Sequence, residues 1–146
     1  MKLQKRGDDA VTEHYNQNYT LKQIEGILNI LKECIASGRY TISQNDNRNE
    51  NIQLIQEYNL TSKKQKNILL SIDVTDFCHS LKNVHIGYEH EILYVFCLQR
   101  ELFNIMGKSE TVDIYIKFNL INKNENKFVI TISFHKRNKP IHYLFR

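Results

Sequence analysis

The spacing of apolar residues changes once along this chain, and that change restricts the fold more than any other feature. Between residues 20 and 81, apolar side chains recur every three or four positions, whereas from residue 92 they are continuous or alternate with polar ones. The first spacing is typical of amphipathic helices and the second of β-strands. Because the helices precede the strands, the sequence predicts an α+β fold, with N-terminal helices packed on a mainly antiparallel C-terminal sheet.

The beginning of the chain differs in character from the rest. Residues 1–19 are polar and show little periodicity, which predicts a mobile or loosely docked N-terminal arm. Residues 20–146 contain no repeat and no linker, so we expect them to form a single domain. Its first helix is predicted at residues 21–35, because Thr20 and Gln23 have the spacing of a capping box.

Further short elements are predicted between this helix and the strands. They are a strand at residues 40–42 and helices at residues 52–58, 61–72 and 74–81. The last of these helices begins after Asp73, a residue type that is common at helix N-caps.

Three strands are predicted in the second half of the chain. Residues 92–98 are almost all apolar, which is typical of a central strand that is covered on both faces. Residues 112–120 and 128–134 alternate between apolar and polar residues, and the polar turn between them predicts an antiparallel hairpin. The alternation predicts that the even-numbered residues of both strands face the helices.

The composition is that of a folded domain without disulfides or membrane spans. The chain has 146 residues, of which 41% are hydrophobic, so it is long enough to bury one core. Its cysteines, Cys34, Cys78 and Cys97, are odd in number and lack C-x-x-C spacing, which favours reduced thiols over a disulfide framework or a zinc site. No apolar run has the length of a membrane helix, and the N-terminus lacks the apolar stretch of a signal peptide. We therefore expect a cytoplasmic protein.

Positive charge is concentrated at the C-terminal end. The net charge is +4, but residues 111–146 alone carry seven basic and two acidic side chains, a net charge of +5. A local basic patch is typical of proteins that bind nucleic acid, because neutralising phosphates releases counterions. An excess of this size is also common on ordinary solvated surfaces.

The predicted strand alternation places chemically useful side chains on one sheet face. If the even-numbered residues face the helices, the opposite face holds Tyr115, Lys117, Ser133 and His135, and it is followed by Lys136, Arg137 and Lys139. RNA cleavage without a metal needs a base for the 2′-hydroxyl, an acid for the leaving 5′-oxygen and cations for the charge on phosphorus. Histidine suits both proton-transfer roles. The alternative is a polar face that is merely solvated.

Other motifs give weaker indications. The residues His85, Glu89, His90 and Glu91 are close in sequence, but their spacing fits no metal-binding helix, so we interpret the segment as a solvated loop. The sequence has no P-loop, no G-x-G-x-x-G and no G-x-S-x-G, so it predicts neither a nucleotide cofactor nor a hydrolase triad. We expect no metal and no cofactor.

Three segments, in their order along the chain, resemble the MqsR-type toxins of bacterial type II toxin–antitoxin systems. They are DFCHSL at residues 76–81, VDIYIK at residues 112–117 and VITISFHK at residues 129–136. The resemblance covers roughly residues 21–136 and depends on the combination of segments rather than on any single motif. It implies a RelE-like fold and the activity of an mRNA interferase, an endoribonuclease that cleaves mRNA without a metal and is inhibited by an antitoxin.

The resemblance also implies site residues. The tyrosine and lysine of the family's V-Y-x-K strand correspond to Tyr115 and Lys117, and the basic residue after its S-F pair corresponds to His135. Where the family has a lysine in D-F-Y-K-S, this chain has His79. A glutamine of the family has no secure counterpart here, and Gln99 is one candidate.

Together these observations predict a metal-independent endoribonuclease acting on mRNA, with an antitoxin protein as its partner. In this hypothesis Lys117, Lys136, Arg137 and Lys139 bind phosphates, Tyr115 contacts the scissile phosphate, and His79 and His135 divide the acid and base roles. Alternatives are a non-catalytic RNA-binding or protein-interaction module of the same fold, and a structural partner for an antitoxin.

Overall fold

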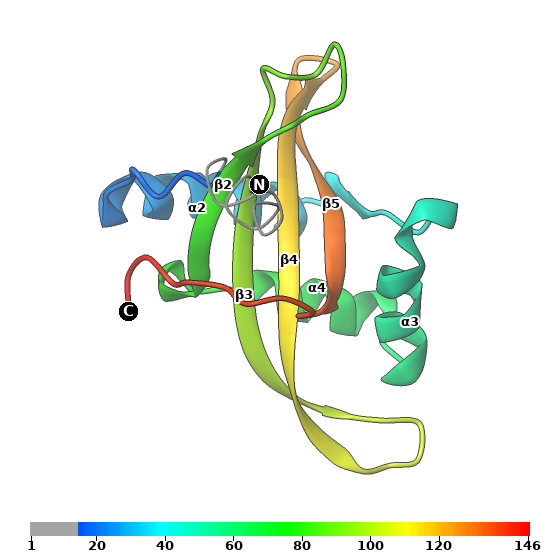
Figure 1. The fold of residues 1–146 in the computed structure, drawn as a ribbon. Coiled ribbons are helices and arrows are strands. Elements are labelled where there is room, and N and C mark those ends of the chain that lie inside the picture. Colours follow the sequence, from blue (N-terminus) through cyan, green and yellow to red (C-terminus); the bar gives the residue numbers. More distant parts are fainter. Residues whose placement is uncertain (1–14) are drawn as a thin grey trace, which may run out of the picture.

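The computed structural model describes residues 15–146, which form three α-helices and one five-stranded sheet (Figure 1). The helices are α2 (Leu21–Ala36), α3 (Asn49–Glu57) and α4 (Ser62–Leu70), and the 3-10 turns are η1 (Asp46–Arg48) and η2 (Val74–Asp76). The strands are β1 (Tyr40–Ile42), β2 (Phe77–Lys82), β3 (Ile92–Phe103), β4 (Ser109–Lys123) and β5 (Asn126–Lys136). The predicted α+β class is therefore confirmed.

The sheet is mixed, with strand order β1-β5-β4-β3-β2. β2, β3, β4 and β5 pair antiparallel along the sheet, and the short β1 adds to β5 in parallel. The hairpin predicted from the last two alternating segments is β4 and β5. The apolar run predicted as the central strand lies in β3, which has a neighbour on each side, although β4 is the middle strand.

The first helix begins and ends as its sequence predicts. At its start the Thr20 hydroxyl accepts from the Gln23 backbone N–H, and the Gln23 side chain accepts from the Thr20 backbone N–H. This pair satisfies two of the backbone donors that a helix leaves free at its N-terminus. After the helix, Gly38 has a φ of +79°, a conformation that glycine adopts at little cost.

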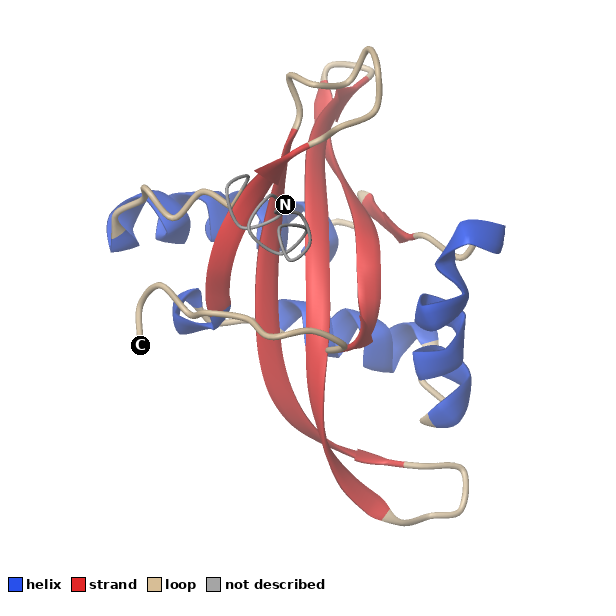
Figure 2. Ribbon diagram, in the orientation of Figure 1, coloured by secondary structure: helices blue, strands red, loops and turns tan. Residues whose placement is uncertain are grey.

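The helices cover one face of the sheet. In Figure 2, α2 and α4 lie behind the strands, and α3 lies beyond β5. The side chains between these layers form one apolar cluster, and among its fully buried members are Ile24, Leu31, Leu69, Phe96, Phe118 and Phe134. Burying side chains of this size contributes about 1.5–3 kcal/mol each, so this cluster supplies most of the stability of the fold.

The helix predicted at residues 74–81 does not form. One 3-10 turn, η2, is followed at Phe77 by extended backbone, and β2 then pairs with β3. The four residues from Phe77 to Ser80 are all buried, and a short buried segment has no polar face that distinguishes a strand from a helix. Pairing with the edge of β3 therefore decides the local structure.

A β-bulge in β5 changes which residues face the helices. Ile116 pairs with Phe134, and both face the helices, but the register shifts after Lys117, so that Phe118 pairs with Thr131. Beyond the bulge, Val129 packs in the helix-facing cluster. The prediction that even-numbered residues face the helices is therefore correct for β4 and for Phe134 but wrong for residues 128–132. One extra residue on one strand produces this shift.

Asn51 of α3 holds the backbone at this bulge. Its side-chain amide donates to the carbonyls of Ser43 (2.8 Å) and Ile132 (2.9 Å), and its side-chain oxygen accepts from the Phe134 N–H (2.8 Å). Only 1% of Asn51 is exposed, so these groups have little access to water as a replacement partner.

The second face of the sheet is covered by two terminal segments. Residues 137–146 cross this face (Figure 1), and the Tyr143 hydroxyl donates to the Cys97 carbonyl at 3.0 Å. From the other end of the chain, Asn16 forms an antiparallel bridge with Ser80. A small apolar cluster of Cys78, Val95, Cys97 and Tyr115 lies beneath these segments. Of the predicted arm, residues 15–19 are thus packed on the domain, and residues 1–14 lie outside the described residues.

Two further sequence expectations concern thiols and membranes. Cys34, Cys78 and Cys97 are all buried and free, as expected for reduced thiols. Over residues 15–146, the helices are too short or too polar to cross a membrane.

Asn51→Ala tests how much the hydrogen bonds from Asn51 to the bulge stabilise the fold. We expect the free energy of unfolding to fall by about 2–3 kcal/mol, because one buried and two partly buried backbone groups lose their partner. Denaturant unfolding measures this change. The control Asn49→Ala, at an exposed position at the start of the same helix, should have a much smaller effect. Equal effects of the two substitutions would contradict the account.

Candidate functional site

The sheet face opposite the helices carries Tyr115, Lys117 and His135, and His79 lies on the same face. The prediction that Lys136 joins this site is wrong, because Lys136 pairs with the core residue Ile114 and points to the helix side, where it contacts Glu57. Strand register places the residues of the site face in two adjacent rows across the sheet. One row is His79, Val95, Lys117 and Ser133, and the other is Cys97, Tyr115 and His135. The rows belong to one face because positions two residues apart along a strand point to the same side.

Their separations follow from the strand order. Tyr115 and His135 are direct neighbours on β4 and β5, and their rings stack with centroids 5.3 Å apart. Lys117 is the next residue of β4 on the same face. His79 lies on β2, three strand spacings from β5, which is roughly 14 Å along the sheet. Tyr115, Lys117 and His135 are therefore a compact group, and His79 lies apart from His135.

Lys117 is a half-buried cation with cationic neighbours. Burial, together with repulsion from Arg48 and Lys139, lowers the pKa of Lys117 to about 8. Within residues 15–146, neither Lys117 nor these two neighbours forms an ion pair with a carboxylate. The site therefore holds positive charge that the described part of the chain leaves uncompensated, which favours the binding of an anion.

A cavity of about 270 Å³ lies beside these cations, and we call it the Lys117 pocket. It is bounded by β2, by the loop after β2, by β4 and by η1. Its lining residues are Tyr15, Arg48, Leu81, Lys82, Asn83, Val84, His85, Leu93, Lys117, Ile132 and Lys139. This lining has four basic side chains and no carboxylate, a composition suited to phosphate.

Two of the other predicted phosphate-binding cations are already paired with carboxylates. Lys136 forms a salt bridge with Glu57 at 3.0 Å, and Arg137 forms one with Asp113 at 3.3 Å. Lys139 instead lies with its Nζ 5.2 Å from the centre of the Tyr115 ring. Lys117 and Lys139 thus have charge available for a ligand, whereas a ligand of Lys136 or Arg137 competes with a carboxylate.

His79 is buried and neutral at physiological pH. Its ring stacks on Tyr15 with centroids 3.9 Å apart, and 3% of the residue is exposed. Burial lowers the pKa of His79 to about 4, assisted by the charges of Lys139, Lys117 and His142. Its Nε2 atom is buried without a hydrogen-bond partner among the described residues, so nothing in residues 15–146 compensates a proton there.

Tyr115 is equally buried, with 2% of the residue exposed. The side chains of Ile141 and Tyr143 in the C-terminal tail pack against its cluster. Burial raises the pKa of the Tyr115 hydroxyl, so it remains protonated and able to donate. Within residues 15–146 this hydroxyl has no hydrogen-bond partner, which is rare for a buried polar group in a folded protein.

His135 is the more accessible of the two histidines. Its Nδ1 lies 2.8 Å from the Lys136 carbonyl oxygen. Because a carbonyl only accepts, Nδ1 carries the proton in this hydrogen bond, which leaves Nε2 as the acceptor nitrogen of the neutral ring. His135 also lines a cavity of about 230 Å³ at the N-terminal end of α3, shared with Arg48. Arg48 thus borders both cavities.

Sequence reasoning missed three residues of this site. Arg48 precedes α3 in a polar loop, Tyr15 lies in the segment predicted as an arm, and Lys82 ends β2, which was predicted as a helix. None of them lies on the predicted hairpin, so no local pattern connects them with it. The charge of Arg48 was visible, but its approach to Lys117 depends on the packing of η1 and α3 against β5.

Two other candidates from the sequence are Gln99 and a metal site in the segment from His85 to Glu91. Gln99, the candidate for the family's glutamine, donates to Asp113 at 3.0 Å. In the described part of the chain, no three His, Cys, Asp or Glu side chains converge as metal ligands do, and this includes the segment from His85 to Glu91.

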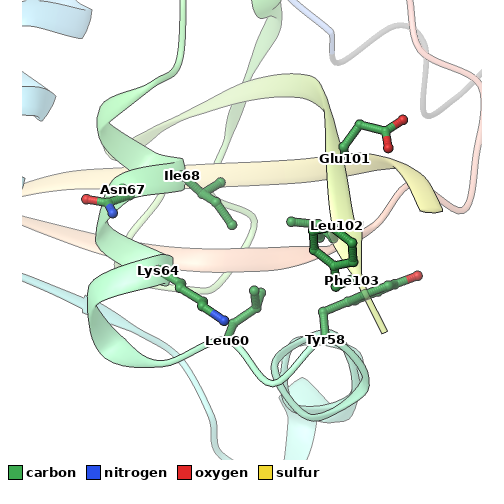
Figure 3. Close-up of a pocket in the computed structure, with 8 residues that line it drawn as sticks. All are labelled: Tyr58, Leu60, Lys64, Asn67, Ile68, Glu101, Leu102 and Phe103. Carbon is green, nitrogen blue, oxygen red and sulfur yellow. The ribbon is translucent and has the colours of Figure 1, made fainter. Parts of the chain in front are cut away.

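A third cavity, also of about 270 Å³, lies on the other side of the sheet, between the end of α3, α4 and β3 (Figure 3). Its walls include the apolar side chains of Leu60, Ile68, Leu102 and Phe103. It contains none of the predicted site residues, and we do not assign the function to it.

The buried His79 predicts a specific loss of stability in acid. Its pKa in the folded state, about 4, lies below the ordinary value of 6.5, so the unfolded chain takes up the proton first. We expect stability to be unaffected by His79 above pH 6.5 and to fall by about 3 kcal/mol as the pH falls to 4. Denaturant unfolding of wild type and His79→Phe across this range measures the difference. Parallel pH profiles for the two proteins would contradict it.

Tyr115→Phe separates chemistry from stability. Because the buried hydroxyl has no partner among the described residues, its removal should leave the free energy of unfolding unchanged or raise it by about 1 kcal/mol. Thermal or denaturant unfolding measures this change. A fall of about 2 kcal/mol in the free energy of unfolding would mean that the hydroxyl has a structural partner.

Comparison of the chain with protein-family models, with curated proteins and with solved structures found no match. The geometry of the sheet face and the resemblance of the three sequence segments are therefore the grounds for a functional assignment.

Proposed function

We propose that the protein is a metal-independent endoribonuclease, an mRNA interferase of the MqsR type with a RelE-like fold, which acts in the cytoplasm and is inhibited by a cognate antitoxin. One observation carries the proposal. Tyr115, Lys117 and His135 are neighbours on one sheet face, beside Arg48 and Lys139, two cations without a paired carboxylate in residues 15–146. The order of the three resembling segments supports it.

The proposed reaction uses the neighbouring residues of this face. His135 Nε2 takes the proton from the 2′-hydroxyl, because its Nδ1 already donates to the Lys136 carbonyl. The 2′-oxygen then forms a bond to phosphorus, and the bond from phosphorus to the 5′-oxygen breaks. Lys117, whose pKa is about 8, gives its proton to the leaving 5′-oxygen. The products are a 2′,3′-cyclic phosphate and a 5′-hydroxyl.

The remaining groups stabilise charge on phosphorus. The Tyr115 hydroxyl stays protonated because burial raises its pKa, and it donates to a non-bridging oxygen. Arg48 and Lys139 supply positive charge beside it. A preorganised set of donors and cations of this kind usually makes the largest single contribution to catalysis.

His79 has no proton-transfer role in this mechanism. It lies three strands from His135, and groups roughly 14 Å apart do not act on the same phosphate. The division of acid and base roles between the two histidines, which the sequence suggested, is therefore replaced by His135 and Lys117. His79 instead contributes a ring that packs against Tyr15.

A non-catalytic RNA-binding module is the second candidate, and the burial of Tyr115 favours it. With 2% of this residue exposed beneath the C-terminal tail, a phosphate reaches its hydroxyl only if Ile141 and Tyr143 move. Binding at the more accessible Lys117 and Lys139 requires no such movement.

Cleavage of single-stranded RNA in the presence of EDTA distinguishes the two functions. We expect the wild type to produce 2′,3′-cyclic phosphate ends, and His135→Asn and Lys117→Gln each to lower the rate by about 100-fold or more. Lys123→Gln removes an equal charge further along β4 and should retain the activity. Bound but uncut RNA would support the non-catalytic module, and equal rates in wild type and His135→Asn would contradict the proposed mechanism.

A further inference from the structure

We propose that the Lys117 pocket is a phosphate-binding site, in which Arg48 and Lys139 hold a backbone phosphate of single-stranded RNA next to the phosphate that is cleaved, and Lys117 lies between the two phosphates. The inference rests on the proposed function only in its choice of RNA as the ligand. It adds Arg48 as a residue for substrate binding and assigns the pocket to a nucleotide that does not react.

The charges of the pocket lack a partner within the described chain. Among residues 15–146, the ion pairs involve Lys136, Arg137 and Arg146, and none involves Arg48, Lys117 or Lys139. Holding three like charges close together, one of them half-buried, is unfavourable for the protein alone. A phosphate between them removes that repulsion, and its oxygens accept the hydrogen bonds that these donors offer.

The elements that carry these cations are fixed by packing. Lys117 lies in the middle strand, and Arg48 immediately precedes α3, which Asn51 ties to β5. Lys139 lies in the C-terminal tail, over the ring of Tyr115. Three separate segments thus converge on one cavity. Two of them are rigid, so little conformational entropy is lost when a phosphate binds.

One observation favours a nucleic-acid phosphate over a free anion. Arg48 borders both this pocket and the cavity that contains His135, so a strand that occupies both places successive phosphates on either side of one guanidinium. A free phosphate fills only one of the two cavities.

Binding of an uncleavable strand tests the site independently of cleavage. The probe is a short fluorescent single-stranded RNA with every 2′-hydroxyl methylated, and fluorescence anisotropy gives Kd at several salt concentrations. We expect Arg48→Gln, Lys117→Gln and Lys139→Gln each to weaken binding about tenfold and to reduce the slope of log K against log salt by about 0.7. The matched control, Lys123→Gln, should change Kd less than about twofold.

The outcomes separate this inference from the proposed function. Equal weakening by Lys117→Gln and Lys123→Gln would mean diffuse attraction to a basic surface and would overturn the site. Inorganic phosphate, titrated with NMR detection, should perturb the Lys117 pocket only weakly, and affinity equal to that of the strand would assign the pocket to a free anion. If the methylated strand binds through Arg48 but unmodified RNA is not cut, the site stands and the catalytic proposal fails. Lys139→Gln, in an exposed tail position, keeps the test valid if Lys117→Gln misfolds.

Discussion

The strands β3 and β4 carry apolar side chains on both faces, so both faces of the sheet must be shielded from water. Helices α2 and α4 shield one face with a large core. The other face has only the terminal segments, which bury a small cluster around Val95 and Tyr115. This thin covering explains why His79 and Tyr115 are buried while polar atoms of both lack hydrogen-bond partners among the described residues. Such groups cost stability, and costs of this kind are typical of functional sites rather than of structural packing.

The charge distribution on that face has two distinct parts. At its rim, Arg137 and Arg146 are neutralised by Asp113 and Asp76, and Lys136, which points to the helix side, is neutralised by Glu57. Around the Lys117 pocket, within residues 15–146, the cations have no such partners. The excess of positive charge in the last quarter of the sequence is therefore divided between structural pairs and a small group that is available for an anion. Only the second group, joined by Arg48 from the helical half, supports the proposed binding of RNA.

Much of this fold follows from local sequence patterns, and the exceptions have physical causes. The capping box at Thr20 and the alternation in β4 predict their elements correctly because the responsible contacts are close in sequence. Strand β2 was predicted as a helix because its residues are buried on both faces and its pairing with β3 is a tertiary contact. The bulge near Lys117 was not predicted because it depends on Asn51, more than eighty positions from its partner Phe134 in the chain. For the same reason the sequence suggests the hairpin residues of the candidate site, whereas it does not connect Arg48 and Tyr15 with them.

The central claim is that Lys117 carries a charge that the described protein leaves uncompensated and that an RNA phosphate compensates. NMR titration of the Lys117 side chain, labelled at its terminal carbon, tests this claim most directly. In the free protein the account predicts a pKa of about 8, and with the methylated strand bound it predicts a pKa raised toward the ordinary value for lysine. A pKa near 10.5 in the free protein, unchanged by the strand, would contradict the account.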